Sequence, residues 1–224
     1  FSLGHSLGEF TAFAVSGAFS FAEAIRLVNL RGKFMQETCV GTDAGMTVVL
    51  GLSDEVVEGI CKNAQDEGLQ IYAANYNCDG QIVVAGVRAD LAKYEAKFKE
   101  AGAKRAMLLN MSVASHCPIL EPASVKLANE LEGVLAANFA PVVSNVNAKI
   151  YTDKNEALVL LKEQLTHPVR YKQSIKNYEN EVDCFIELGA ATLKGINKKI
   201  TEKPTYSVTD MASLEEVVKI LEER

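Results

Sequence analysis

Residues 1–17 read FSLGHSLGEFTAFAVSG and contain the pattern G-x-S-x-G at residues 4–8. A helix-forming apolar run follows at once, and Gly17 marks its end. In this pattern the serine occupies a sharp turn between a strand and a helix, where flanking side chains would collide with both neighbours. No strand is evident before the turn, because only three residues precede Gly4. The stretch predicts the strand-to-helix turn of an α/β fold, with Ser6 at the helix N-terminus.

Working outward, the next element is a helix over residues 21–37, which Ser20 and Glu23 are predicted to begin with a reciprocal capping box. A separate group with the order β-α-β-β-α-β follows, and this is the ferredoxin-like split unit. Its strands are expected at residues 47–50, 70–74, 81–85 and 104–109, and its helices at 54–66 and 91–101. We therefore expect residues 41–111 to form a small ferredoxin-like subdomain.

Beyond residue 111 strands and helices alternate again. Helices are expected at residues 123–135, 155–165, 169–178, 193–200 and 213–222, and strands at 141–146, 184–188 and 205–208. The strand at 184–188 has the composition of a buried one. Such alternation predicts a parallel sheet with helices against it. The sequence thus predicts a large α/β subdomain, residues 1–40 and 112–224, which carries the small one as an insertion.

Composition excludes several classes of protein. The 224 residues are 48% hydrophobic, enough for a sizeable core, and carry a formal net charge of −6. Bulk nucleic-acid binding is disfavoured, because phosphate contacts need clustered positive charge. No apolar run approaches the length of about 18 residues that a membrane helix needs. The five cysteines include no C-x-x-C pair, which disfavours a disulfide framework or zinc ribbon and favours a reducing compartment such as the cytoplasm.

A serine nucleophile needs a base, and the chain has three histidines. His5 is next to Ser6, and neighbours in such a turn point apart, so a packing or hydrogen-bonding role is expected for it. His167 is expected in a loop before a helix. His116 follows the last strand of the small subdomain, in a loop that re-enters the large one, where functional groups often lie. The residues alone place His116 only slightly ahead of His167 as the base.

An arginine interrupts the apolar face of the helix over residues 21–37. At about 100° per residue, Arg31 falls near the middle of that face, with Val28 and Met35 as neighbours. A buried Arg must find an anion, because an unpaired buried charge is costly. The anion is either an internal Asp or Glu, or a substrate carboxylate bound in bidentate fashion near the nucleophile. The helix pattern leaves both interpretations open.

Five motifs occur in the same order as in one known family. They are GHSLGE at residues 4–9, LRGKFMQ at 30–36, NYN at 75–77 with GQIVVAG at 80–86, VASH at 113–116, and QL at 164–165. Together they resemble the malonyl-CoA:acyl carrier protein transacylases of type II fatty-acid synthesis, from residue 1 to near the C-terminus. Five motifs in register are far more specific than G-x-S-x-G alone.

The resemblance implies a fold and a set of roles. The fold would be a hydrolase-like large subdomain with a ferredoxin-like insert, in agreement with the order of elements above. Ser6 and His116 would form a catalytic dyad, and the Leu7 N–H would be half of an oxyanion hole. Arg31 would clamp the free carboxylate of malonate. The main-chain carbonyl of Gln164 would orient the histidine.

The resemblance also implies a ping-pong reaction with two partners, a coenzyme A thioester and an acyl carrier protein, and no metal or redox cofactor. Asn75 and Asn77, in the NYN motif, are further substrate-binding candidates. Carrier proteins are typically acidic, so a local basic patch is expected despite the negative total charge. The candidates for this patch are Lys104, Arg105, Lys198 and Lys199. Taken singly, each of them reads as ordinary surface charge.

Two departures from the family pattern stand out. The family begins well before the turn, with a Gly-Gln-Gly segment whose Gln supplies the other oxyanion N–H, and residues 1–224 do not include it. The chain is therefore expected to be a fragment that is weakly active by itself. Residues 189–191 read Gly-Ala-Ala where the family often has Gly-Pro-Gly, a tolerated loop change. Leu7 resembles malonyl-selective members, whereas residues 114–116 are shared with some methylmalonyl-selective ones, so malonyl is the expected extender and methylmalonyl is the alternative.

Three alternatives remain from the sequence. A serine esterase of α/β-hydrolase type would need the chain order Ser, Asp or Glu, His, which Asp79 before His116 formally satisfies. Arg31 would have no role in that enzyme. The second alternative is an acyltransferase domain of a polyketide synthase. The third is a non-catalytic protein that uses the turn at Ser6 only structurally.

Overall fold

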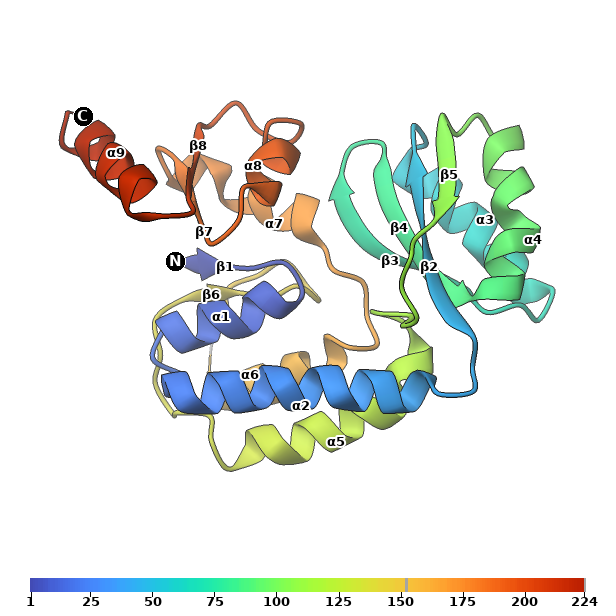
Figure 1. Cartoon of the computed structure of the whole chain (residues 1–224), viewed down its shortest axis with the longest axis horizontal. Coiled ribbons are helices and arrows are strands. Elements are labelled where there is room, and N and C mark those ends of the chain that lie inside the picture. The colour runs from blue at the N-terminus through green and yellow to red at the C-terminus, as the bar shows by residue number, and fades with distance from the viewer. Residues whose placement is uncertain (152, 224) are drawn as a thin grey trace. The chain divides into compact units, whose positions relative to one another are not determined.

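The computed structural model describes residues 1–151 and 153–223. The chain divides into two compact units, Phe1–Ser174 and Ile175–Arg224, which are described separately (Figure 1). Within the described part, the first unit holds β1 (Ser2–Leu3), α1 (Leu7–Val15), α2 (Phe21–Cys39), β2 (Ala44–Leu50), α3 (Asp54–Asp66), β3 (Ile71–Cys78), β4 (Gln81–Val87), α4 (Arg88–Glu100), β5 (Arg105–Leu108), the 3-10 turn Pro118–Leu120, α5 (Glu121–Glu132), β6 (Val142–Val143), α6 (Lys154–Glu163) and the start of α7 (Tyr171–Tyr178).

The turn that carries Ser6 does follow a strand, although none was evident from the sequence. Strand β1 has two residues and pairs in parallel with β6, with Ser2 opposite Val142 and Leu3 opposite Val143. This β1–β6 pair lies beside α1 (Figure 1). The strand escaped prediction because its pairing partner lies about 140 residues away in the sequence, beyond the reach of a local pattern.

Helices α1, α2, α5 and α6 build the first apolar core of this unit. Phe10 and Phe13 of α1 and Leu27 of α2 are fully buried in it. The Phe13 ring lies 4.9 Å from the Tyr151 ring, edge-on, which favours a single packing arrangement. Burial of these large side chains accounts for the position of α1, and therefore for the direction in which the turn before it points.

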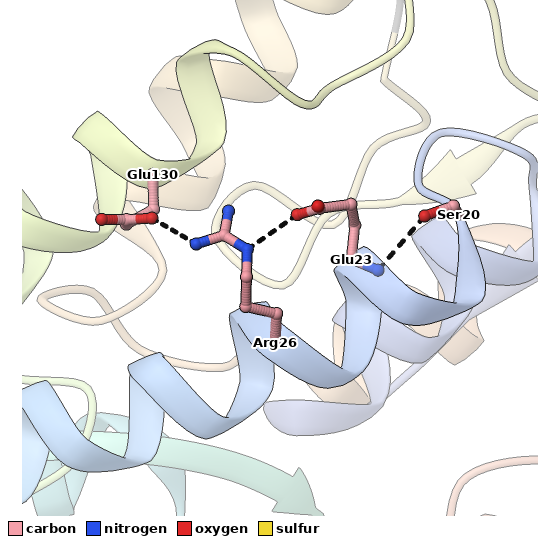
Figure 2. A network of polar contacts seen from close by, with 4 residues as sticks. All are labelled: Ser20, Glu23, Arg26 and Glu130. Atoms are coloured by element: carbon pink, nitrogen blue, oxygen red, sulfur yellow. Dashed lines mark hydrogen bonds and ion pairs between the residues drawn. The ribbon is translucent and has the colours of Figure 1, made fainter.

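Helix α2 begins as predicted at its N-cap, but with half of the expected box. The Ser20 hydroxyl accepts a hydrogen bond from the Glu23 N–H at 3.2 Å (Figure 2). The predicted return bond from Glu23 is wrong, because its carboxylate instead accepts a 2.9 Å bond from Arg26 Nε. Arg26 also pairs with Glu130 of α5, so this partly exposed arginine links the two helices (Figure 2). A charge-assisted hydrogen bond from the guanidinium is stronger than one from the Ser20 backbone amide, so the Glu23 carboxylate bonds Arg26.

The small sheet of the first unit has the strand order β3-β4-β2-β5, with every neighbouring pair antiparallel. Helices α3 and α4 lie on one face of it (Figure 1). The order β-α-β-β-α-β is that of the ferredoxin-like split unit, as expected. A second apolar core, which includes Ile71, Ile82 and Phe98, fills the space between sheet and helices. The predicted limits of this subdomain, residues 41–111, remain a prediction.

Strand β3 is longer than predicted. It continues past Ala74 to Cys78, with a register shift between Ala73 and Asn75. Its last residues include Asn75 and Asn77, whose low strand propensity ended the predicted strand too early. Both asparagines are nearly fully buried, so tertiary contacts override the local preference.

The second unit contains the end of α7, a 3-10 turn at Glu179–Glu181, β7 (Phe185–Leu188), α8 (Thr192–Asn197), β8 (Thr205–Val208) and α9 (Met211–Glu222). Strands β7 and β8 pair in parallel, as alternation predicts, but as a two-stranded sheet of their own. The prediction of a buried strand here is wrong: Leu188 is 69% exposed. Glu187 is the inward residue instead, because its carboxylate accepts hydrogen bonds from the Leu193 and Lys194 N–H groups, both at 2.8 Å, at the start of α8.

Candidate active site

Ser6 lies at the point where β1 gives way to α1, in a strained backbone conformation. Its φ of 55° is unusual for a residue other than glycine, and such strain collects at functional turns. A Cβ added to Gly4 would lie 1.9 Å from the Gly8 carbonyl carbon, so only glycine fits there. The prediction of a similar collision at Gly8 is wrong for the described residues. Apart from the adjacent residues and the nearby backbone of α1 itself, no atom lies within 4 Å of a Cβ built there, because it is the Gly8 backbone that approaches Gly4.

Asn145 holds the turn from the opposite side. The Ser6 N–H donates to Asn145 Oδ1 at 2.8 Å, and Asn145 Nδ2 donates to the Gly4 carbonyl at 2.6 Å. Both functions of one buried amide therefore brace the two ends of the turn. The side chain offsets part of the cost of the strained φ at Ser6 by satisfying backbone groups that the turn leaves unpaired.

His116 contacts the Ser6 hydroxyl. Ser6 Oγ and His116 Nε2 are 2.7 Å apart, and His116 Nδ1 is 2.7 Å from the main-chain oxygen of Gln164. A carbonyl oxygen can only accept, so Nδ1 carries the hydrogen and Nε2 is left to accept from the serine. This is the tautomer that a general base for Ser6 needs.

The electrostatic surroundings keep His116 neutral. Burial, followed by the positive charge of Arg31, lowers its pKa to about 3, against a smaller opposing effect of the Gln164 carbonyl. The ring is therefore in its base form throughout the neutral range. His116 also has a φ of 62°, so the loop that presents it is strained in the same way as the turn at Ser6.

Arg31 of α2 lies beside the same hydroxyl. Its side chain is buried, and NH2 donates to Ser6 Oγ at 3.0 Å and to Gln164 Oε1 at 3.2 Å. Burial lowers its pKa to about 10, opposed by the charge of Glu9, so the guanidinium stays protonated at neutral pH. Within the described chain its Nε has no hydrogen-bond partner. A buried cation with an unused donor next to a nucleophile can accept an anion.

Gln164, at the C-terminal end of α6, connects these groups. Its side-chain Nε2 donates to the Ser6 carbonyl at 2.8 Å and to Glu9 Oε2 at 2.7 Å. Its Oε1 accepts from Arg31 and its main-chain oxygen faces His116. One fully buried residue thus fixes the serine backbone, the histidine ring and the arginine side chain.

Three residues of this arrangement were not among the sequence candidates: Glu9, Asn145 and Tyr151. Glu9 is fully buried, and its Oε1 accepts from the Asn145 N–H at 3.1 Å and from the Tyr151 hydroxyl. Burial raises the pKa of Glu9 to about 7, opposed by the hydrogen bonds it accepts and by the charge of Arg31. The available signal was a carboxylate beside Phe10 on the apolar face of α1, the same kind of signal that singled out Arg31.

The other sequence candidates lie at varying distance from Ser6. Asn77 Oδ1 is 2.8 Å from His5 Nε2, and so reaches the turn through its neighbour, as the expected role of His5 allows. Asn75 is buried in β3 and forms an isolated backbone bridge with Val169. For the described residues the structure gives neither asparagine a hydrogen bond to Ser6. His167, the competing base, is exposed.

The basic candidates are exposed, as surface charges would be. Lys104 and Arg105 lie at the start of β5 in the first unit. Lys198 and Lys199 follow α8 in the second unit and line a hollow of about 370 Å³ together with Lys176 and Lys203. Glu179 and Glu202 line the same hollow, so its charge is mixed.

Across 1–151 and 153–223, no three His, Cys, Asp or Glu side chains are grouped to hold a metal ion. None of the five cysteines, all of which lie in these ranges, forms a disulfide bond. No helix in the described ranges is long and apolar enough to cross a membrane.

Comparison with known proteins defines the class to which this fold and site belong. The sequence model of the acyl transferase domain matches residues 2–218. A malonyl CoA-acyl carrier protein transacylase from Haemophilus influenzae is 38% identical over 222 residues, which are 97% of this chain and 71% of that protein. The chain belongs to the acyl transferase family, as a relative of the malonyl CoA-acyl carrier protein transacylases, and is an acyltransferase.

Solved structures agree with this assignment. The malonyl-CoA:acyl carrier protein transacylase from Helicobacter pylori has a TM-score of 0.94 and 46% identity, covering 99% of this chain and 71% of its own. A malonyl-transacylase solved in complex with a type II PKS acyl-carrier protein has a TM-score of 0.91 and 37% identity, over 97% of this chain and 72% of that one. This chain of 224 residues therefore spans about 70% of the length of these relatives.

Proposed function

We propose that this protein transfers a malonyl group from malonyl-CoA to the phosphopantetheine thiol of an acyl carrier protein, through a malonyl-Ser6 intermediate. One observation carries the proposal: the buried guanidinium of Arg31 lies 3.0 Å from the hydroxyl of Ser6, which His116 Nε2 contacts at 2.7 Å. A nucleophile, a base and a fixed cation therefore meet at one oxygen. The names of the relatives supply the substrate and the partner.

In the first half-reaction Ser6 Oγ attacks the thioester carbonyl while its proton passes to His116 Nε2. The Leu7 N–H is in the first turn of α1, where helix geometry gives an amide no intrahelical acceptor, and it would donate to the oxyanion. The C–O bond to Ser6 is retained while the thioester C–S bond breaks, and His116 gives the proton to the departing coenzyme A sulfur. The Gln164 carbonyl holds the ring through Nδ1 in both protonation states.

The second half-reaction runs the same steps in reverse order with another thiol. The phosphopantetheine thiol gives its proton to His116 Nε2 and attacks the carbonyl carbon of the malonyl-Ser6 ester. The Ser6 C–O bond breaks, and the proton returns from His116 to Ser6 Oγ. Because coenzyme A leaves before the carrier protein reacts, the kinetics are ping-pong.

Arg31 supplies selectivity for an acyl group that ends in a carboxylate. Its Nε donor has no partner in the described residues, and a carboxylate can take two donors of one guanidinium at once. An acetyl group would leave that donor unpaired in a buried place, which costs binding energy. Asn75 and Asn77 remain candidates for further contacts to the substrate.

The adduct itself provides the test. We expect brief exposure of the full-length protein to malonyl-CoA to add one malonyl group, seen by intact mass, faster than acetyl-CoA adds an acetyl group. The Ser6→Ala variant serves as the control and should gain no mass. A folded protein that takes an acyl group from neither thioester would contradict the proposal.

The geometry does not favour the serine esterase alternative, which needs Asp79 as the acidic partner of His116. Asp79 is exposed and its carboxylate pairs with Lys172 Nζ at 3.0 Å, whereas His116 Nδ1 faces the Gln164 carbonyl. Whether the acceptor belongs to fatty-acid or to polyketide synthesis depends on the carrier protein, and relatives of the second kind are known.

Carrier-protein docking through the basic candidates gives a separate prediction. Charge reversal at Lys198 and Lys199 together, or at Lys104 and Arg105 together, is expected to lower the rate of transfer to an acidic carrier protein several-fold at low salt, because complementary charge steers association. The rate of acylation by malonyl-CoA should not change. Stopped-flow measurement of both half-reactions decides, and equal effects on the two would reject that pair as a docking site.

A further inference from the structure

Glu9 is a buried carboxylate in the immediate neighbourhood of Arg31. Both residues hydrogen-bond the same side chain, since Gln164 gives its Oε1 to Arg31 and its Nε2 to Glu9 Oε2. Glu9 is fully buried and Arg31 is 5% exposed. The charges of the two side chains therefore oppose one another across this amide. A substrate carboxylate on Arg31 would bring a second negative charge into the same enclosed volume.

Two carboxylates near one buried guanidinium leave one negative charge uncompensated, which is costly in a low-dielectric site. The charged and titratable groups around Glu9 are Arg31 from α2, Tyr151 from the segment after β6, and His116 beyond Gln164, with Glu156 of α6 acting on Tyr151. Arg31 is the cation among them, and His116 is neutral. A proton on Glu9 would therefore restore the balance.

The hydrogen bonds of Glu9 permit that protonation. Its three donors are the Asn145 N–H, the Gln164 amide and the Tyr151 hydroxyl. The first two can only donate in this arrangement. The hydroxyl, however, can turn from donor to acceptor without moving its oxygen. A protonated Glu9 Oε1 can thus donate to Tyr151 while Oε1 still accepts from the Asn145 N–H and Oε2 from the Gln164 amide. The hydroxyl hydrogen of Tyr151 then turns toward Ser144, whose side chain also hydrogen-bonds Tyr151.

We propose that Glu9 takes up a proton from solvent when a substrate carboxylate binds Arg31, and that the Tyr151 hydroxyl reverses from donor to acceptor to hold it. The inference rests on the proposed function, in which Arg31 receives the malonyl carboxylate. Glu9 does not touch the substrate and is a positioning residue that acts through Arg31 and Gln164. Burial already brings the pKa of Glu9 to about 7, so the proton is taken up near physiological pH.

Calorimetry tests the coupling without turnover. We expect the Ser6→Ala protein at pH 8 to take up about one proton on binding malonyl-CoA, since a group with a pKa near 7 is mostly ionised there beforehand. The number of protons taken up is the difference in binding heat between two buffers, divided by the difference between their ionisation enthalpies. Acetyl-CoA, which carries the same phosphates but no free carboxylate, should cause none.

Matched variants decide the assignment. In the Ser6→Ala protein, a further Glu9→Gln change should abolish the uptake but leave malonyl-CoA binding, which should become independent of pH. A Glu23→Gln change instead, at a partly exposed carboxylate that pairs with Arg26, should leave the uptake intact. In proteins that retain Ser6, the KM for malonyl-CoA relative to acetyl-CoA should rise up to about tenfold per pH unit above pH 7 and stay flat in Glu9→Gln. Malonyl-CoA binding without uptake would overturn the inference. Absence of binding by both thioesters would instead contradict the proposed function.

Discussion

Replacing His116 with alanine is expected to slow the loading of Ser6 by malonyl-CoA about 10²–10⁴-fold, the usual contribution of a positioned general base. The effect should be large because the ring is the sole histidine in contact with Ser6 Oγ among the described residues. It should appear in the rate of loading rather than in thioester binding, since the imidazole acts on the proton that moves in the transition state. Rapid-quench mass spectrometry of the acylated protein measures both quantities.

His167→Ala is the matched control for that experiment. His167 is exposed and was the competing base in the sequence, so its removal should leave the loading rate unchanged. A loss of similar size in His167→Ala, or a His116→Ala protein that loads at the normal rate, would contradict the assignment of the base. Because burial and Arg31 hold the pKa of His116 at about 3, protonation of this ring should not limit the rate at pH values near neutrality.

The histidine also marks the limit of inference from sequence. Ser6 and Arg31 each gave a local signal, a turn pattern in one case and a charge on an apolar helix face in the other. His116 gave only a weak one, since its place in a loop that re-enters the large subdomain put it only slightly ahead of His167. What distinguishes the two is contact with Ser6 and Gln164, residues 110 and 48 positions away. Resemblance to a family supplied that choice, and local pattern could not.

Fold prediction succeeded and failed for similar reasons. Helix α3 and strand β8 have the predicted limits, Asp54–Asp66 and Thr205–Val208, because their patterns are periodic and bounded by turn residues. Strand β1 was not predicted and β3 was cut short, because both depend on pairing or burial among distant residues. The reading of β7 as buried failed because its inward residue is Glu187, which faces the amides of α8. An apolar composition indicates a strand but does not say which side faces a core.

Glu9 shows the same limitation at the site. Its position in the GHSLGE motif was noted, yet no role followed from it, because the residues that give it one are Tyr151 and Gln164. Arg31 was assigned an anion from the same kind of evidence, with an internal carboxylate and a substrate as the two possibilities. Glu9 is the internal carboxylate and acts on Arg31 through Gln164 rather than by direct contact, which leaves the Nε of the arginine for another acceptor.

Replacement of Arg31 is therefore expected to have the second large effect on loading by malonyl-CoA. Arg31→Ala is expected to lower kcat/KM for malonyl-CoA roughly 30- to 5000-fold. This corresponds to a loss of about 2–5 kcal/mol of transition-state stabilisation, as for loss of one partner of a buried charge pair. Acetyl-CoA offers no carboxylate, so its loading should fall far less, and the malonyl preference should collapse. Loading rates for the two thioesters, measured side by side, give the selectivity directly.

A second arginine on the same helix provides the control for loss of a positive charge alone. Arg26 of α2 is partly exposed and pairs with Glu23 and Glu130 (Figure 2), so Arg26→Ala removes a cation from the same helix without removing a contact to Ser6. We expect it to keep both loading rates and the malonyl preference. Because Arg31 also donates to Ser6 Oγ, its loss will slow acetyl loading somewhat, and the ratio of the two rates is the quantity that isolates the carboxylate. An Arg31→Ala protein with an unchanged ratio would mean that the buried guanidinium serves the serine and the network of Glu9 and Gln164, and that malonyl selectivity arises elsewhere.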